Sequence, residues 1–405
     1  MRVIPSLCFL LAVCSVDARQ GSNSSSSSSS SKAVYVLTNN ADNAVIGVPI
    51  EKNGLLGYGQ IASTGGIGQS GVDSDGLPAG PDSLFSQGAL AVAGEYVFAV
   101  NPGSSTLSML KANHHNPSKL TLVGKPAPIP GDFPNTVAAS VKGRLVCVGT
   151  TGTRAGVSCT TYSKAGLGEF DELRPFDLGQ SNPAVGPENT LSHVLFSADE
   201  SLLYAAVKGD GATGNLGFFA VYPVRYGCSD DTDTDTAASV QVAREGIQSS
   251  PPGTGLLFGA VVVPSSELIF VTDPFGATVL KVDRSTYEAA EVARADVPDQ
   301  MAICWAAYSD KTNSVFVTDV AVNRLVELDA TDARILLTAD LPNDDPGLVD
   351  LQVVDKHIYA LSPGNGTADA AITVFDIDKD RQVQRLSLAG FGAGPSAMGM
   401  AYLEL

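Results

Sequence analysis

The sequence predicts an all-β fold, a seven-bladed β-propeller whose ring is closed by the C-terminal strand. Three observations support this fold class. Two segments are near-copies of one strand–turn–strand unit, the unit recurs along the chain, and a spare strand-forming segment ends the sequence. Propeller blades are four-stranded antiparallel sheets that recur at a period of roughly 40–50 residues, which is the pattern seen here.

The two near-copies lie next to each other in the sequence. Ile269–Asp273 is followed by Thr278–Asp283, and Val315–Asp319 is followed by Arg324–Asp329. Each begins with an apolar, β-branched run, passes through an Asp-led turn and continues as an alternating run. Such runs favour β-strands, and the turn between them predicts a hairpin.

The same unit can be found seven times. The second strand of each unit is predicted at Val34–Asn39, Tyr96–Asn101, Leu145–Gly149, Leu203–Lys208, Leu268–Asp273, Val315–Asp319 and Ile358–Ser362. Six units are preceded by a small-residue, apolar segment suited to the innermost strand, at Gln87–Val92, Thr136–Val141, Leu191–Ser197, Leu257–Val263, Met301–Ala307 and Leu348–Val354.

The first unit lacks such an inner strand, and the chain ends with a spare one at Ser396–Tyr402. Pairing this segment with Val34–Asn39 would close the ring and remove exposed sheet edges. Two stretches rich in Gly, Ser or Asp, Gly57–Ser83 and Gly227–Pro252, are predicted to be loops, which often carry function on a rigid scaffold.

The N-terminus has the pattern of a secretory signal. Arg2 supplies a positive charge, an apolar run follows, and Val16-Asp17-Ala18 has the small residues of a cleavage site. We therefore expect a signal peptide at residues 1–18, a disordered Ser-rich segment at 19–32 and the propeller at 33–405. Asn23 and Asn365 lie in glycosylation sequons.

These features indicate a secreted protein, either extracellular or associated with a cell wall, and we expect a monomer. The net charge of −18 argues against nucleic acid and anionic membranes as partners. Cys147 and Cys159 flank a predicted hairpin in a register that places them opposite each other, so we expect a disulfide between them. Cys228 and Cys304 either pair with each other or stay free.

Several segments resemble fungal secreted proteins of the 3-carboxymuconate cyclase-like group, part of the seven-bladed lactonase superfamily and similar to cell-wall glycoprotein antigens of ascomycetes. The resemblance runs from about residue 33 to the end of the chain. The segments that carry it are Ser83–Gln87, Gly131–Pro134, Cys147–Cys159, Val207–Gly209, Gln300–Trp305 and Phe316–Asp319. It implies lactone formation or hydrolysis on a carboxylated acid.

The intracellular lactonising branch, as the resemblance implies, uses a His and an Arg. Each begins an inner strand, at a fixed spacing before a Pro in the turn that follows. In this chain the spacing falls on Ser192 instead of His193, and on Phe258 instead of an Arg. A shift of one residue turns a strand side chain to the opposite face, so His193 reaches the channel only if the strand contains a bulge. An acidic position that follows is met by Asp273.

A polyanionic substrate would also need cations in the channel. The predicted inner strands contain no Arg or Lys, only His193 and the acidic Asp350, and Lys208 is the one well-placed cation. Trp305 is interpreted as core between blades. The sequence therefore argues against a muconate-like polyanion as the substrate.

Polar residues at strand ends form the candidate site. We predict catalytic roles for Lys208, Asp273 and Asp319, and substrate contacts for the residues near the channel mouth, which are Gln87, Asn101, His193, Gln300 and Asp350, with Asn39 beside them. No cofactor is required by the sequence, although Asp and Asn oxygens could hold Ca²⁺. The alternative is that these side chains cap turns through the backbone.

Two functional hypotheses follow. The first is a secreted hydrolase or lyase of the lactonase type acting on a small, mostly neutral lactone or ester. The second is a non-catalytic adhesin or antigen that binds a host or cell-wall surface component through its loops, with Gly57–Ser83 the first loop to test.

Overall fold

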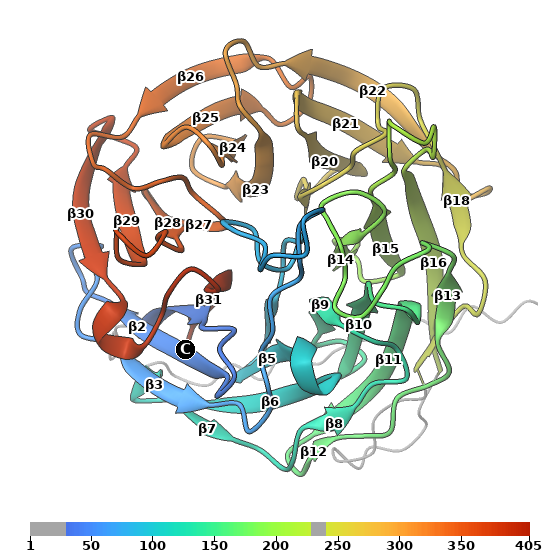
Figure 1. Cartoon of the computed structure of the whole chain (residues 1–405), viewed down its shortest axis with the longest axis horizontal. Helices are drawn as coiled ribbons and strands as arrows, with labels where there is room; N and C mark the ends of the chain where they lie inside the picture. The colour runs from blue at the N-terminus through green and yellow to red at the C-terminus, as the bar shows by residue number, and fades with distance from the viewer. Residues whose placement is uncertain (1–29, 228–239) are drawn as a thin grey trace, which may run out of the picture. The chain divides into compact units, whose positions relative to one another are not determined.

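The computed structural model describes residues 30–227 and 240–405. Its strands form seven antiparallel sheets arranged as blades around a central axis (Figure 1). Residues from Ser31 onward form one compact unit. The predicted seven-bladed propeller is therefore confirmed. No helix among the described residues is long and apolar enough to cross a membrane.

Each blade has four main strands, and in six of the seven blades they follow sequence order from the channel outward. The inner strands are β31 (Met398–Glu404), β4 (Leu90–Ala93), β9 (Pro134–Ser140), β14 (Leu191–Phe196), β19 (Ala260–Val262), β23 (Ile303–Ser309) and β27 (Leu351–Val354). The second strands are β1 (Lys32–Leu37), β5 (Tyr96–Asn101), β10 (Leu145–Thr150), β15 (Leu202–Val207), β20 (Leu268–Asp273), β24 (Ser314–Asp319) and β28 (His357–Ser362).

The outer half of each blade completes the sheet. The third strands are β2 (Ala44–Ile50), β6 (Thr106–Asn113), β11 (Ala155–Ser163), β16 (Phe218–Tyr226), β21 (Gly276–Val282), β25 (Arg324–Asp329) and β29 (Ala371–Asp376). The outer strands are β3 (Gln60–Ser63), β7 (Asn116–Leu122), β12 (Gly166–Leu167), β17 (Val240–Val242), β22 (Ala289–Asp296), β26 (Ile335–Asp340) and β30 (Arg381–Ser387). Short strands β8 (Ala127–Pro128), β13 (Arg174–Phe176) and β18 (Ile247–Ser249) also pair with third strands, and the helical turns are η1 (Pro102–Ser104) and η2 (Ala389–Phe391).

The ring closes as predicted. β31 pairs with β1 in antiparallel register, with Lys32 opposite Glu404 and Val36 opposite Met400. The first blade therefore takes its inner strand from the C-terminus. This pairing ties the two ends of the propeller together and leaves neither strand with an open edge at the seam.

Burial follows strand position. Second strands such as β5 and β24 are buried at every residue, because neighbouring blades cover both faces of these strands. The outer strand β26 alternates between partly buried and exposed residues, as expected where one face meets solvent. The apolar, β-branched sequences of the second strands therefore form the core between blades.

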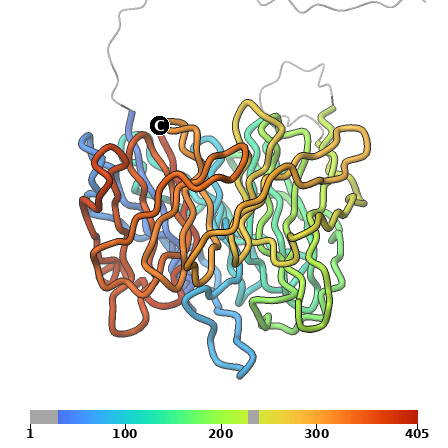
Figure 2. Tube along the Cα trace, turned by 90° about the horizontal axis from the view of Figure 1, so that it is seen from above, coloured from blue at the N-terminus to red at the C-terminus, as the bar shows by residue number. Residues whose placement is uncertain are grey.

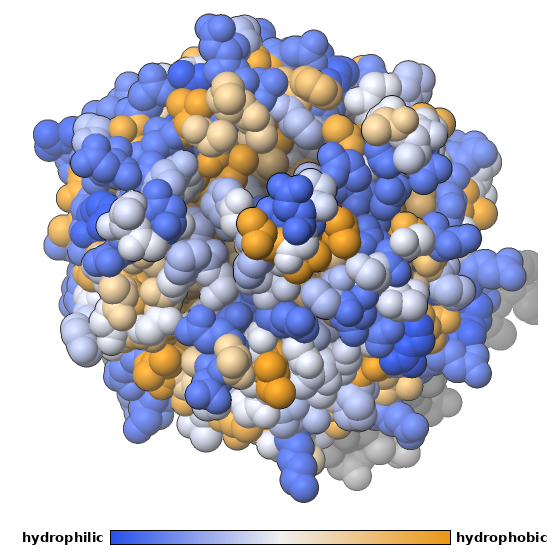
Figure 3. Space-filling view, in the orientation of Figure 1, coloured by the Kyte–Doolittle hydropathy of each residue, from blue (hydrophilic) through white to orange (hydrophobic). Residues whose placement is uncertain are grey.

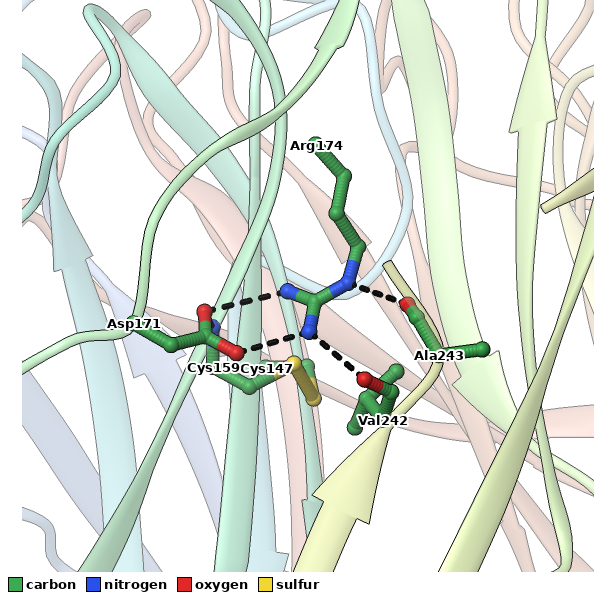
Figure 4. Close-up of a disulfide and its surroundings, with 6 residues drawn as sticks. All are labelled: Cys147, Cys159, Asp171, Arg174, Val242 and Ala243. Carbon is green, nitrogen blue, oxygen red and sulfur yellow. Dashed lines mark hydrogen bonds and ion pairs between the residues drawn. A yellow bond between two sulfur atoms is a disulfide. The ribbon is translucent and has the colours of Figure 1, made fainter. Parts of the chain in front are cut away.

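The predicted disulfide is present. Cys147 on β10 lies directly opposite Cys159 on β11, and their Cα atoms are 4.0 Å apart. Figure 4 shows Arg174 beside it, with its guanidinium donating to the Asp171 carboxylate at 2.7 and 3.0 Å. Cys304 is free and buried, whereas Cys228 lies outside the described residues.

Two predicted loops contain strands. Gly57–Ser83 includes β3, and Gly227–Pro252 includes β17 and β18. The third strands β2 and β16 have free edges that accept these short segments as partners, although Gly, Ser and Asp around them hide the strand pattern. Asn365 is exposed, while Asn23 and the signal segment lie outside the described residues.

The chain between β3 and β4 forms a crossing segment (residues 64–89). Figure 1 shows it passing over the centre of the ring, and Figure 2 shows its tip projecting beyond the ends of the strands. Asn39 holds its near end, since the Asn39 amide donates to the Gln69 carbonyl at 3.1 Å and the Ser83 hydroxyl at 3.2 Å. This segment decides how the channel is divided.

Candidate functional site

The last part of the crossing segment forms a crossbar (residues 83–88) inside the channel. Lys208 Nζ, just after β15, donates to the Phe85 carbonyl at 2.5 Å. The Trp305 indole nitrogen, on β23, donates to the Ser86 carbonyl at 3.1 Å. Side chains from two separate blades therefore satisfy backbone carbonyls that would otherwise be buried without partners.

Gln87 completes the crossbar. Its amide nitrogen donates to the Ala306 carbonyl at 2.8 Å, and its amide oxygen accepts from the Ala306 N–H at 3.1 Å. The Gln87 backbone N–H bonds to the Ser192 carbonyl at 2.9 Å. Both polar atoms of the side-chain amide thus hold the crossbar. Gln87 therefore has a structural role in addition to its place beside a pocket.

The crossbar divides the channel into two pockets with no lining residue in common. The mouth pocket has a volume of about 330 Å³ and lies beneath the crossing segment, with Asp82, Phe85, Lys208, Phe258, Cys304 and Trp305 around it. The channel pocket has a volume of about 350 Å³ and opens along the inner strands, with Gln87, Gly88, His193, Glu200, Asp350 and Gln352 around it.

The mouth pocket has apolar walls. The rings of Phe258 and Trp305 pack edge to face with centroids 4.8 Å apart, and Phe85 lies on the crossbar side. Phe258 occupies the place where the family resemblance implies an Arg, so a ring stands where a guanidinium is expected. The Lys208 ammonium lies 4.1 Å from the centroid of this ring, which supplies a cation at nearly the same place.

Lys208 is a buried ammonium with few compensating partners. Its residue is 3 % exposed, and it forms no ion pair with a carboxylate of the described residues. Burial lowers the pKa of Lys208 to about 8, and the negative charge of Asp82 opposes this shift. A lysine held in this way can change its protonation near neutral pH, as groups at reactive sites often do.

Asp82 faces the same pocket from the crossing segment. Burial raises the pKa of Asp82 to about 6, while Lys208 and the Phe85 N–H, which donates to its carboxylate at 2.7 Å, act in the opposite direction. Burial also raises the pKa of the Cys304 thiol, so that this group stays protonated and unreactive. Asp82 and Lys208 are thus the two titratable groups of the mouth pocket whose charges and positions suit proton transfer and stabilisation of negative charge.

The two predicted catalytic aspartates lie elsewhere. Asp273 forms an ion pair with Arg294 and accepts the Phe275 and Gly276 N–H groups at 2.8 and 3.2 Å. Asp319 accepts two backbone N–H groups at 3.0 Å, those of Met301 and Ala302. Neither lines the mouth pocket. Asp273 caps its own turn, whereas Asp319 holds the segment that precedes β23.

Among the polar residues predicted to contact substrate, some line a pocket and others are held by structural hydrogen bonds or lie away from both pockets. Asn101 is enclosed in a network with Asn43, Thr64 and Ser108, so its amide braces the crossing segment. Gln300 lines neither pocket, and its amide oxygen has no hydrogen-bond partner among the described residues. Of the predicted catalytic residues, Lys208 alone lines the mouth pocket.

His193 reaches the channel because β14 is irregular. The register shifts between Leu191 and His193, which turns the Ser192 hydroxyl toward the Ala206 and Leu257 carbonyls and places His193 in the channel pocket. Burial lowers the pKa of His193 to about 4. Its Nδ1 accepts the Ala260 N–H at 3.2 Å, so the neutral ring carries its proton on Nε2.

Asp350 lies in the channel pocket as well. Its carboxylate accepts the Leu351 and Met400 N–H groups at 2.8 and 2.7 Å, and burial raises its pKa to about 7. His193 and Asp350 therefore share a pocket on the far side of the crossbar from Lys208. No group of three or more His, Cys, Asp or Glu side chains in the described ranges is arranged to hold a metal ion.

Sequence reasoning missed Asp82 and Phe85, and it assigned Trp305 to the core. Trp305 is indeed fully buried, but it also lines the mouth pocket. One sequence feature points to the crossbar, because the segment Ser83–Gln87 is among those that carry the family resemblance. The role of this segment depends on contacts with residues far away in the sequence. By itself the segment has neither helical nor strand periodicity, so its sequence does not predict where it lies.

Comparisons with known proteins agree on the fold. No protein-family model matches the chain, and no curated protein matches it in sequence. The periplasmic gluconolactonase of Pseudomonas aeruginosa superposes with a TM-score of 0.65 at 13 % identity, covering 92 % of this chain and 99 % of that chain. A putative 6-phosphogluconolactonase of Bacteroides fragilis gives 0.60 at 11 % identity, covering 94 % and 100 %. The chain is thus a seven-bladed propeller similar in fold to lactonases.

Proposed function

We propose that the protein is a hydrolase that opens a small, uncharged lactone or ester in the mouth pocket. The observation that carries this proposal is the placement of the Lys208 ammonium and the Asp82 carboxyl in one apolar pocket without a direct ion pair between them. The likeness of the fold to lactonases supports it. Fold alone leaves the chemistry open, and these two groups are what indicates hydrolysis.

The two groups have complementary roles. The Asp82 carboxylate takes a proton from water as the water oxygen bonds to the carbonyl carbon. The Lys208 ammonium stabilises the negative charge that develops on the carbonyl oxygen, an interaction that is strong in a pocket with few competing waters. The bond from the carbonyl carbon to the ring oxygen of a lactone, or to the alkoxy oxygen of an ester, then breaks and Asp82 returns the proton to that oxygen. The product is a hydroxy acid from a lactone, or an acid and an alcohol from an ester.

Charge favours an uncharged substrate over a polyanion. Lys208 is the one cation among the residues that line the mouth pocket, and Asp73, Asp82 and Glu188 line it too. A phosphorylated or tricarboxylated acid would meet three carboxylates on a protein of net charge −18. We therefore propose a neutral substrate, which differs from the carboxymuconate that the family resemblance implies.

A pH-indicator assay on a panel of neutral and carboxylated lactones and esters, with and without Ca²⁺, tests this function. Lys208→Met and Asp82→Asn should each lower kcat/KM by about 100-fold or more, the loss typical for one oxyanion donor or one general base. Lys119→Met and Asp75→Asn remove the same charges at exposed positions and should retain activity. Activity in either pocket variant equal to that of its control would overturn the assignment.

A binding function through the crossing segment is the second candidate. Its tip projects from the face of the propeller (Figure 2), and Leu77 at the tip is 61 % exposed. Val72 and Pro78 form a β-bridge, so that residues 73–77 can be replaced by a short Gly linker without disturbing the crossbar. Adhesion to fungal or host surfaces that is lost in this variant would favour binding, and unchanged adhesion would count against it.

We also propose that the protein is secreted and glycosylated at Asn365. The disulfide between Cys147 and Cys159 supports an oxidising compartment, and the Asn365 sequon is exposed. Mass spectrometry of the protein from its native source should find an N-terminus near Arg19 and a glycan on Asn365. An N-terminus at Met1 would contradict secretion through the signal segment.

A further inference from the structure

Four exposed apolar residues are chain neighbours of residues that line the mouth pocket. Each follows or precedes, in the chain, a residue that lines the pocket, as in the pairs Phe275 with Pro274 and Met301 with Ala302. We call this set the apolar rim. Its members and their exposed fractions are Leu77 at 61 %, Val185 at 39 %, Phe275 at 56 % and Met301 at 65 %.

The rim comes from three separate parts of the fold that meet on one face. Leu77 belongs to the crossing segment and Val185 precedes β14, whereas Phe275 lies in the turn between β20 and β21 and Met301 lies just before β23. Figure 3 shows apolar surface gathered near the centre of this face, where the crossing segment lies. Large apolar side chains around a pocket mouth are typical of a surface that a ligand covers.

The pocket beneath the rim is small. Its volume of about 330 Å³ is near the lower end of the roughly 300–1,000 Å³ that ligand pockets span. A ring the size of a simple lactone fits inside, close to Lys208 and the rings of Phe258 and Trp305. A larger substituent would extend out of the pocket, toward the segments that carry the apolar rim.

We infer that the substrate is an amphipathic lactone or ester, with an uncharged head in the mouth pocket and an aliphatic or aromatic substituent that lies over the apolar rim. This inference rests on the proposed function for the identity of the head group. The observation behind it is that exposed apolar residues stand next, in the chain, to residues that line a pocket with aromatic walls. The carboxylates of Asp73 and Glu188 at the mouth would repel a substituent that carries negative charge.

Binding can be measured without turnover, because Trp305 is the sole tryptophan of the chain and lines the mouth pocket. Its fluorescence is followed during titration with γ-lactones that carry a methyl, hexyl or decyl substituent, and with one that carries a carboxylate. Affinity should rise from methyl to hexyl, by up to about fourfold for each methylene that the rim covers. The carboxylated lactone should bind more weakly than the methyl one.

Rim variants separate the rim from the pocket. Phe275→Ser and Met301→Ser, alone and combined, should reduce the gain from methyl to hexyl by about tenfold or more while binding of the methyl lactone is retained. Val292→Ser is the matched control, since Val292 is 53 % exposed on the outer strand β22, away from the mouth.

The outcomes distinguish this inference from the proposed function. Chain-length-dependent binding without hydrolysis would refute the hydrolase while the ligand class stands. The inference would be overturned by hydrolysis with an affinity that does not depend on chain length, or by rim variants whose affinity depends on chain length as strongly as that of the wild type. Tighter binding of the carboxylated lactone, or no binding of any probe, would overturn it as well.

Discussion

Replacing Lys208 with methionine should change how the stability of the protein depends on pH. The ammonium is buried beside Phe258, and burial lowers the pKa of Lys208 from 10.5 to about 8. Between these values the unfolded chain holds the proton while the folded protein has released it. The unfolded state therefore binds more protons in this range, and the stability contributed by Lys208 rises as the pH increases.

The size of the effect follows from the two pKa values. At 1.36 kcal/mol for each pH unit, the full difference is roughly 3 kcal/mol, of which roughly 2.5 kcal/mol has developed by pH 10. Below pH 8 both states are protonated, so the cost of burying the charge is fully present. Methionine has a similar length and no charge, and its variant lacks this term at every pH.

Urea denaturation followed by circular dichroism at several values from pH 7 to pH 10 measures this difference. The free energy of unfolding of the wild type should rise by roughly 2.5 kcal/mol relative to that of Lys208→Met over this range. Lys119→Met, at an exposed position of β7, controls for the loss of a positive charge. If the free energies of unfolding of the wild type and Lys208→Met change equally with pH, burial does not destabilise the ammonium, and the reasoning is refuted.

Three further predictions concern activity, acid stability and the disulfide. The rate of lactone hydrolysis should rise with pH through about 6, as Asp82 ionises, and fall above about 8, as Lys208 loses its proton; a flat profile in a pH-rate assay would contradict both roles. Burial lowers the pKa of His193 from 6.5 to about 4. As the pH falls between these values, the free energy of unfolding of the wild type should therefore decrease by about 3 kcal/mol relative to that of His193→Gln, measured by denaturation. An equal decrease in both proteins would show that the ring is not buried in its neutral form. Replacing Cys147 and Cys159 together by Ala should cost about 3 kcal/mol in the same measurement, and a cost near zero would indicate that the bridge constrains little.

Much of the fold could be predicted because its information is local. The near-copies Ile269–Asp273 and Val315–Asp319 are strands in the structure, with the predicted residues at both C-terminal ends. The pairing of Cys147 with Cys159 follows from the register of one hairpin. The repeat of the blade and the spare strand at the C-terminus are likewise patterns in contiguous residues, and period-2 alternation together with hairpin turns is sufficient to specify them.

The candidate site could be predicted only in part. Lys208 was identified because a cation at a strand end stands out in an acidic, apolar sequence. Asp273 and Asp319 have the same position in their blades, yet the structure turns their carboxylates to Arg294 and to backbone donors. Sequence position places a residue at an end of a strand, but it does not decide whether the carboxylate faces the channel or is held by an arginine or by backbone N–H groups.

The sequence by itself determined the seven blades, the closure of the ring and the disulfide, since each depends on periodicity or register among neighbouring residues. The tertiary structure alone decided that residues 83–88 cross the channel, that Asp82 faces the pocket of Lys208, and that a bulge at Ser192 turns His193 inward. The crossbar is held by Lys208 and Trp305, which lie 123 and 219 residues away from the carbonyls to which they donate. A segment without a period of its own is placed by such distant partners, and their positions exist only once the ring has closed.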